Sequence, residues 1–203
     1  MLHSISFVRW CGLAAMLGGA LWVIGNVIHA SKPQGCIAEE CALRPMRDTG
    51  ALEGILMLLS LMLFVVGAAG LLVLARRLGR FGRMGNAGVV IGAVGVVVLV
   101  IAGLIQALFF GGDFPLMPGF VIPGVLALIV GFVLLGIAIL RAGVLPRWAA
   151  LLFIVGALAM LGFNEQNWRT LMAIPLGVAW VAVGYVLWSG VSVPTGQPTA
   201  RVR

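Results

Sequence analysis

Charged side chains are scarce in this chain. Asp, Glu, Lys and Arg make up 9% of its 203 residues, whereas hydrophobic residues make up 62%. A soluble domain carries about 25% charged residues, so this chain lacks the side chains needed to cover a water-exposed surface. The mean hydropathy of +1.17 agrees with that shortage. The composition excludes an ordinary soluble domain and predicts a protein that lies largely in lipid.

Acids, histidines and cysteines are also few: six, two and three, respectively. The two histidines, His3 and His29, fall on opposite sides of the membrane, which excludes a bis-histidine haem, and no His/Cys cluster suits zinc. Walker, Rossmann, nucleophile-elbow and potassium-filter motifs are absent from the sequence. The net charge of +7 comes with no RNA- or DNA-binding pattern. We therefore expect no metal site and no nucleic-acid partner.

Long apolar runs are abundant, and about 20 residues suffice to cross a bilayer as a helix. The run at the N-terminus partly resembles a secretory signal, but it is too long and Ile28 is too large for a cleavage site, so an uncleaved span is expected. The fifth run is short and would borrow flanking residues. We predict an all-α, polytopic bundle of six spans in one domain, residues 1–190, with an external loop, 31–50, and a flexible cytoplasmic tail, 191–203. The runs are 7–30, 51–75, 85–110, 119–140, 148–163 and 171–189.

Arginines gather between the second and third runs, in the sequence "RRLGRFGR". Together with the termini and the turn between the fourth and fifth runs, this set of segments holds nine arginines and no acid. The opposite set holds four cations and all six acids. Because Lys- and Arg-rich short loops stay cytoplasmic, both termini are expected inside. We interpret the arginines of this run as topology determinants in contact with anionic lipid; the alternative is a docking site for a cytoplasmic partner. They are Arg76, Arg77, Arg80 and Arg83.

The second and third spans resemble the fourth and fifth around their arginine turns. Residues 71–95 and 137–159 both pass from an apolar helix through Arg, a small-residue turn and Arg into a Gly- and Ala-rich helix. A parallel duplication of this kind occurs in some transporters. The alternative is that two membrane hairpins with arginine turns look alike without common origin.

Glycines line one side of the third span, at Gly88, Gly92 and Gly95. Small residues let membrane helices approach closely. The pattern predicts packing within the bundle; a homodimer seam or docking to another subunit is the alternative.

Polar residues outside the arginine turns gather at the expected outer surface. The candidates are His29, Glu53, Asp113, Glu165 and Arg169. Each alone could be solvated at a helix end, but an ionisable group in a membrane protein is a functional candidate. As a group, they would form an outward-facing pocket for a lipid headgroup, a quinone or a small polar ligand.

Two cysteines, Cys36 and Cys41, fall in the external loop. A disulfide is expected on this oxidising side; free thiols or a thiol-exchange role are the alternatives, although the spacing is not the C-x-x-C of redox proteins. Cys11, inside the first span, reads as a small buried hydrophobe.

Two segments, "GVLPRWAALLFIVG" (143–156) and "NWRTLMAIPLGVAWVAVGYVLW" (167–188), resemble uncharacterised multi-pass membrane proteins of GC-rich, actinobacterial-type bacteria over about a fifth of the chain. The resemblance implies a bacterial inner-membrane protein and no particular activity. We expect a non-catalytic accessory or structural subunit, with lipid or a lipophilic cofactor held in glycine-lined grooves. A small transporter and a quinone- or thiol-linked redox enzyme are the alternatives.

Overall fold

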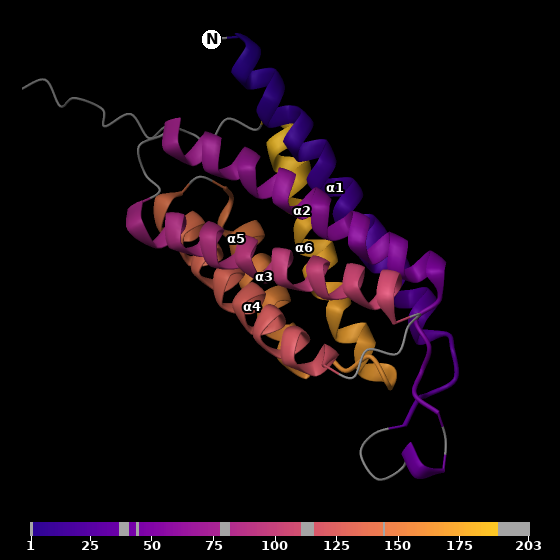
Figure 1. Ribbon diagram of the computed structural model, residues 1–203. Helices are drawn as coiled ribbons and strands as arrows, with labels where there is room; N and C mark the ends of the chain where they lie inside the picture. The colour runs from indigo at the N-terminus through magenta and orange to yellow at the C-terminus, as the bar shows by residue number, and fades with distance from the viewer. Residues whose placement is uncertain are drawn as a thin grey trace, which may run out of the picture.

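The fold is all-helical in the part of the chain that the computed structural model describes, residues 2–36, 41–43, 45–77, 82–110, 116–143 and 145–190. Six α-helices follow one another (Figure 1). The six apolar runs of the sequence correspond to these helices. They are α1 (Leu2–Ala30), α2 (Ala51–Arg77), α3 (Gly82–Phe109), α4 (Met117–Ala142), α5 (Arg147–Ala159) and α6 (Ile174–Ser189), with 3-10 turns η2 (Met160–Gly162) and η3 (Trp168–Ala173) between the last two.

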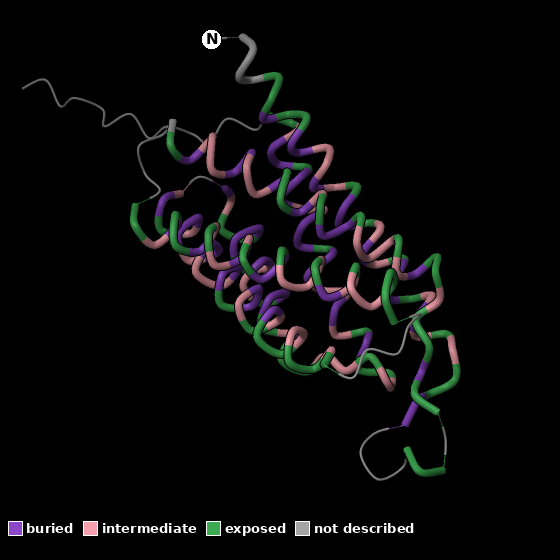
Figure 2. The backbone as a smooth tube through the Cα atoms, viewed as in Figure 1, coloured by how far each residue is buried: buried purple, intermediate pink, exposed green. Residues whose placement is uncertain are grey.

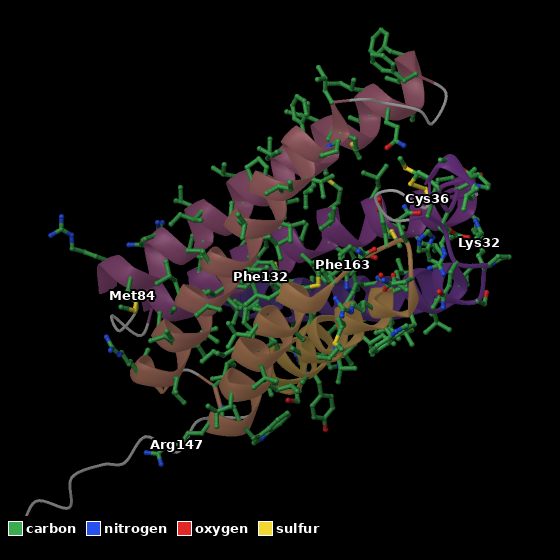
Figure 3. All side chains as sticks on the ribbon, turned by 90° about the horizontal axis from the view of Figure 1, so that it is seen from below. Lys32, Cys36, Met84, Phe132, Arg147 and Phe163 are labelled. Atoms are coloured by element: carbon green, nitrogen blue, oxygen red, sulfur yellow. A yellow bond between two sulfur atoms is a disulfide. The ribbon has the colours of Figure 1, made fainter. Side chains whose placement is uncertain are left out.

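Five of the helical segments are long and apolar enough to cross a membrane, the last being η3 with α6. The exception is α5, whose 13 residues extend only about 20 Å at about 1.5 Å per residue, short of a hydrocarbon core of about 30 Å. In Figure 3, Phe163, which follows η2, lies part-way along the bundle rather than at its end. Six complete crossings therefore remain a prediction.

The helices pack in two groups. In the first, α1 contacts both α2 and α6 extensively; in the second, α3 and α4 form the closest pair, and α5 joins the groups by packing on α4 and α6. The successive hairpins bring Met84 and Arg147 to one end of the bundle, and Lys32 and Cys36 to the other (Figure 3). The arginine turns thus share one end. The duplication of two hairpins stays a prediction.

Apolar side chains cover the outside of the bundle as well as its inside. Buried and exposed stretches alternate along every helix (Figure 2), and the exposed faces carry large hydrophobic residues such as Leu17, Ile24, Val90, Val130 and Val155. A helix that is hydrophobic all round belongs in lipid or a deep core. The fold therefore fits a multi-pass integral membrane protein.

Glycines bring two antiparallel helix pairs into close contact. A Cβ added at Gly88 would lie 2.9 Å from Gly131 O, and one at Gly95 would lie 2.7 Å from Gly124 O, so α3 packs directly on the backbone of α4. Gly92 is buried in the same seam. These glycines pack against the facing helix within the chain. Lipid in glycine-lined grooves stays a prediction.

The α1–α6 pair repeats this arrangement. A Cβ at Gly12 would lie 2.8 Å from Gly184 O, and Gly19 faces Gly177 O one heptad further along. Both seams leave no room for side chains, so they depend on small residues in the way expected of membrane helices.

Aromatic rings fill the centre of the bundle around Trp180, which is fully buried. The ring of Phe64 stacks on it at 4.8 Å, and those of Phe132 and Phe153 meet it edge-on at 5.4 and 5.0 Å; Trp22 extends the cluster beyond Phe64. These residues come from α1, α2, α4, α5 and α6. The middle of the bundle is therefore a packed core.

Candidate functional site

The buried polar side chains of the described residues gather at the end opposite the arginine turns. Five of the six lie there: Asn26, His29, Arg47, Glu53 and Thr170. The sixth, Ser60, bonds to the carbonyl oxygen of Leu56 within its own helix. Around the five, two segments lie over the ends of α1 and α2, and we call their described residues, 31–36, 41–43, 45–50 and 163–170, the polar cap.

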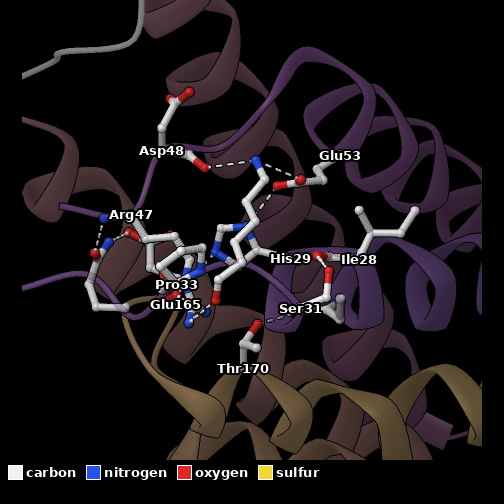
Figure 4. A network of polar contacts seen from close by, with 12 residues as sticks. Ile28, His29, Ser31, Pro33, Arg47, Asp48, Glu53, Glu165 and Thr170 are labelled. Carbon is white, nitrogen blue, oxygen red and sulfur yellow. Dashed lines mark hydrogen bonds and ion pairs between the residues drawn. The ribbon is translucent and has the colours of Figure 1, made fainter.

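His29 lies at the centre of this cluster, in the last turn of α1. Its Nδ1 is 2.8 Å from Glu53 Oε2, and its Nε2 is 3.0 Å from the backbone oxygen of Glu165 (Figure 4). The other carboxylate oxygen of Glu53 is 2.7 Å from Lys32 Nζ, which also donates to Asp48 O at 3.0 Å. His29 and Glu53 are only 1% and 3% exposed. This is a largely buried, charged centre that joins two helix ends to both segments of the cap.

Arg47 fastens the two segments of the cap to each other. Its Nε donates to Pro33 O at 2.9 Å and its Nη2 to Lys32 O at 3.2 Å, while Nη1 donates to Glu165 O at 3.0 Å and Asn167 O at 3.3 Å. The planar guanidinium suits such a fan of acceptors. No carboxylate is among these partners; the cation is held by backbone carbonyl groups, and it closes the loop 31–50 onto residues 165–167.

Backbone contacts reinforce this closure. Gly35 N–H donates to Gln166 O at 2.8 Å, and the Gln166 side chain accepts from Arg47 N–H at 2.6 Å. A Cβ at Gly35 would collide with Gln166 and Arg47. Only glycine therefore lets the two segments approach this closely.

Below the charged centre, Asn26 links α1 to η3. Thr170 Oγ1 donates to Asn26 Oδ1 at 3.2 Å, while Asn26 Nδ2 donates to Trp22 O at 2.8 Å. The indole N–H of Trp22 donates to Ala173 O at 3.0 Å. These bonds attach the 3-10 turn to the side of α1 and carry the cap segment that follows α5.

A disulfide joins Cys36 and Cys41, with Cα atoms 4.8 Å apart. Cys36 is buried and its N–H donates to Pro45 O at 3.2 Å, whereas Cys41 is exposed. The bridge cross-links the loop 31–50. Cys11, far from this pair, is free and buried.

The residues proposed from the sequence differ in burial and in contacts. It brings His29 and Glu53 into contact, and it adds Glu165 through its backbone oxygen, while the Glu165 side chain and Arg169 are exposed. Asp113 lies outside the described residues, as does Arg80. The two buried candidates, His29 and Glu53, bind each other, and the outward-facing pocket stays a prediction.

Two cations of the centre, Lys32 and Arg47, were not proposed from the sequence. Lys32 follows His29 by three positions, which is one helical turn, and this spacing could have suggested a shared partner. Arg47 offered no such signal, because a loop arginine near a membrane is ordinarily solvated or in contact with headgroups.

An open hollow of about 450 Å³ does exist beside the centre, and it is bordered by the loop rather than by the proposed residues. Its lining is Lys32, Pro33, Gln34, Gly35, Pro45, Met46, Arg47 and Asp48. Within the described part of the chain, no three His, Cys, Asp or Glu side chains are grouped to hold a metal ion.

These features define a helical protein of the integral membrane class with a polar cap at one end. No family model, no curated protein and no solved structure matches the chain.

Proposed function

We propose that this is a non-catalytic protein of the bacterial inner membrane, with both termini in the cytoplasm, that serves as an accessory or structural subunit of a larger membrane assembly and carries bound lipid. The observation that carries the proposal is the internal pairing of the polar cap. Buried His29 and Glu53 bind each other, Glu53 also binds Lys32, and His29 and Arg47 bind backbone oxygens. Side chains occupied in this way hold a surface in shape, whereas a reaction centre needs groups aimed at a substrate.

A docking surface for a partner is available on the same cap. Leu43 and Met46 are 92% and 68% exposed on the external loop, where they are separated from the helices that face lipid. Apolar side chains displayed on a loop suit burial against a protein partner. The disulfide of Cys36 and Cys41 cross-links this loop.

Lipid would bind at the opposite end of the bundle. Five arginines there have exposed side chains, and no acid of the sequence falls in the same set of turns. Phospholipid phosphates are their natural counter-ions, and the exposed Trp10 and Trp148 suit the headgroup level. The five are Arg9, Arg76, Arg83, Arg141 and Arg147.

The test is purification from native membranes in a mild detergent after cross-linking in the membrane. We expect a partner, or a second copy of the chain, at fixed stoichiometry, and we expect L43A/M46A to lose it. The matched control is L108A, which removes a side chain of 72% exposure from the helical surface. A lone monomer under these conditions, or equal loss of the partner in both variants, would contradict the proposal.

The two alternative functions have less support. A carrier needs polar groups at mid-depth, where aromatic rings surround Trp180 instead. A redox enzyme would need the disulfide to exchange with a substrate thiol. Cys41 is exposed enough to be attacked, so purification with and without a thiol-reactive probe would separate this alternative from a structural bridge.

A further inference from the structure

We propose that His29 and Glu53 form a proton-binding site, and that the proton they hold couples the pH outside the bundle to the docking of the polar cap. When the site fills, a proton from water binds His29 Nδ1 and is shared with Glu53; when it empties, that proton returns to water. No other reactant is needed. The inference does not depend on whether the cap also binds a partner.

The geometry requires an extra proton in this pair. Glu165 O is a carbonyl oxygen and can only accept, so His29 Nε2, 3.0 Å away, must carry a hydrogen. The other nitrogen, Nδ1, is 2.8 Å from Glu53 Oε2. A neutral ring would then present a lone pair to an ionised carboxylate. The contact is a hydrogen bond only if one further proton lies between Nδ1 and Oε2.

The helix ends indicate where that proton resides. His29 is in the last turn of α1, where the helix dipole favours a cation, and Glu53 is in the first turn of α2, where it favours an anion. An imidazolium paired with a carboxylate therefore fits both positions. Lys32 Nζ lies 2.7 Å from the other oxygen of Glu53, so a second cation faces this carboxylate.

Two further cations lie around the pair. Lys32 approaches from the residues that follow α1 and Arg47 from the cap loop. On the acidic side, Glu53 faces the ring from α2. The side chains of Asp48 and Glu165 are exposed, and these two residues contribute backbone oxygens to the centre instead. Among the described residues, the buried carboxylate of Glu53 therefore faces His29, Lys32 and Arg47 when the proton is bound.

Loss of the proton would weaken the hold on the cap. A neutral His29 keeps one hydrogen, on either Nδ1 or Nε2. If Nδ1 lacks it, the Nδ1 lone pair faces the lone pairs of Glu53 Oε2; if Nε2 lacks it, the Nε2 lone pair faces those of Glu165 O. In either case a buried ring nitrogen is left without a donor, which changes an equilibrium by roughly tenfold to a hundredfold. Glu165 O keeps its bond from Arg47 Nη1, but one of the two contacts that hold His29 to Glu53 and to Glu165 is lost. The opening of the cap should therefore increase by about that factor at alkaline pH.

The first test reads the proton directly. The chain has two histidines, so a H3Q background labelled with ¹⁵N-histidine gives one imidazole by NMR in detergent. We expect both His29 nitrogens to be protonated at mildly acidic pH, and E53Q, whose amide can donate to Nδ1, to show a neutral ring under the same conditions. An unprotonated nitrogen in the wild-type ring at mildly acidic pH would overturn the proposal.

The second test reads the cap. Trypsin does not readily cut before proline, so the chain resists cleavage after Lys32 and Arg44, each of which is followed by proline. Cleavage after Arg47 requires its hydrogen bonds to Pro33 O and Glu165 O to break. At each pH, the rate of cleavage after Arg47 is divided by the rate of cleavage of a free peptide with the same sequence. We expect cleavage after Arg47 to accelerate roughly tenfold or more from mildly acidic to mildly alkaline pH, and to stay flat in E53Q. Equal pH dependence in both proteins would contradict the coupling.

Discussion

Replacing Arg47 by alanine should release the polar cap from the helix ends. The guanidinium donates four hydrogen bonds, to the carbonyl oxygens of Lys32, Pro33, Glu165 and Asn167. A hydrogen bond from a charged donor contributes about 1.5–3 kcal/mol, and water that enters the vacated site recovers part of it. Counting about 1 kcal/mol for each bond, we expect local opening to become easier by about 4 kcal/mol, which is about a thousandfold.

Hydrogen exchange of the cap measures this opening. The amides of Gly35 and Cys36, bonded to Gln166 O and Pro45 O, should exchange faster in R47A, while those of α4 should not change. The control is R169A, which removes the same charge from an exposed side chain and should shift exchange by less than about 0.5 kcal/mol. Unchanged protection of the two amides in R47A would refute the claim that Arg47 holds the two cap segments together.

Three further predictions concern the bundle and its loop. G95L forces α3 away from the α4 backbone, whose nearest atoms lie 2.7 Å from the added Cβ, and should lower the thermal midpoint by the equivalent of at least about 2 kcal/mol. G119A, with open space around it, should leave the midpoint unchanged. Equal effects of the two variants would contradict the close packing of α3 on α4. C36S removes the bridge to Cys41, so the alkylated mass without reductant should show one free thiol more than in the wild type, and stability should fall by about 2 kcal/mol for so short a ring. One free thiol fewer than in the wild type would mean that the bridge is absent. W180F removes a buried indole N–H that has no partner in the described residues and should change the free energy of unfolding by no more than about 1 kcal/mol. W180A should lower it by about 3–5 kcal/mol in chemical denaturation. A large loss in W180F would show that the N–H is bonded.

The helical class could be predicted from the sequence because it depends on composition. A chain with 62% hydrophobic residues can satisfy its backbone in lipid only as helices or a closed barrel, and apolar runs of this length indicate helices. The pairing of the helices could not be predicted. Glycine stripes occur on α1, α3, α4 and α6, and nothing local specifies that Gly88 meets Gly131 or that Gly12 meets Gly184.

The site was predictable only in part, for a related reason. His29 and Glu53 stood out because each is an ionisable group at the end of an apolar run. Their contact with Glu165 involves a backbone oxygen, and backbone groups carry no sequence signal. The burial of Arg47 depends on four carbonyl groups that assemble only when the two cap segments fold together.

The orientation of the bundle is the central claim, and labelling in intact cells tests it most directly. W168C and W148C replace tryptophans of similar exposure, 57% and 54%, at the cap end and at the arginine end. With a membrane-impermeant maleimide, we predict that W168C is labelled in intact cells and that W148C is labelled only after permeabilisation. Labelling of W148C in intact cells, with W168C protected, would contradict the account.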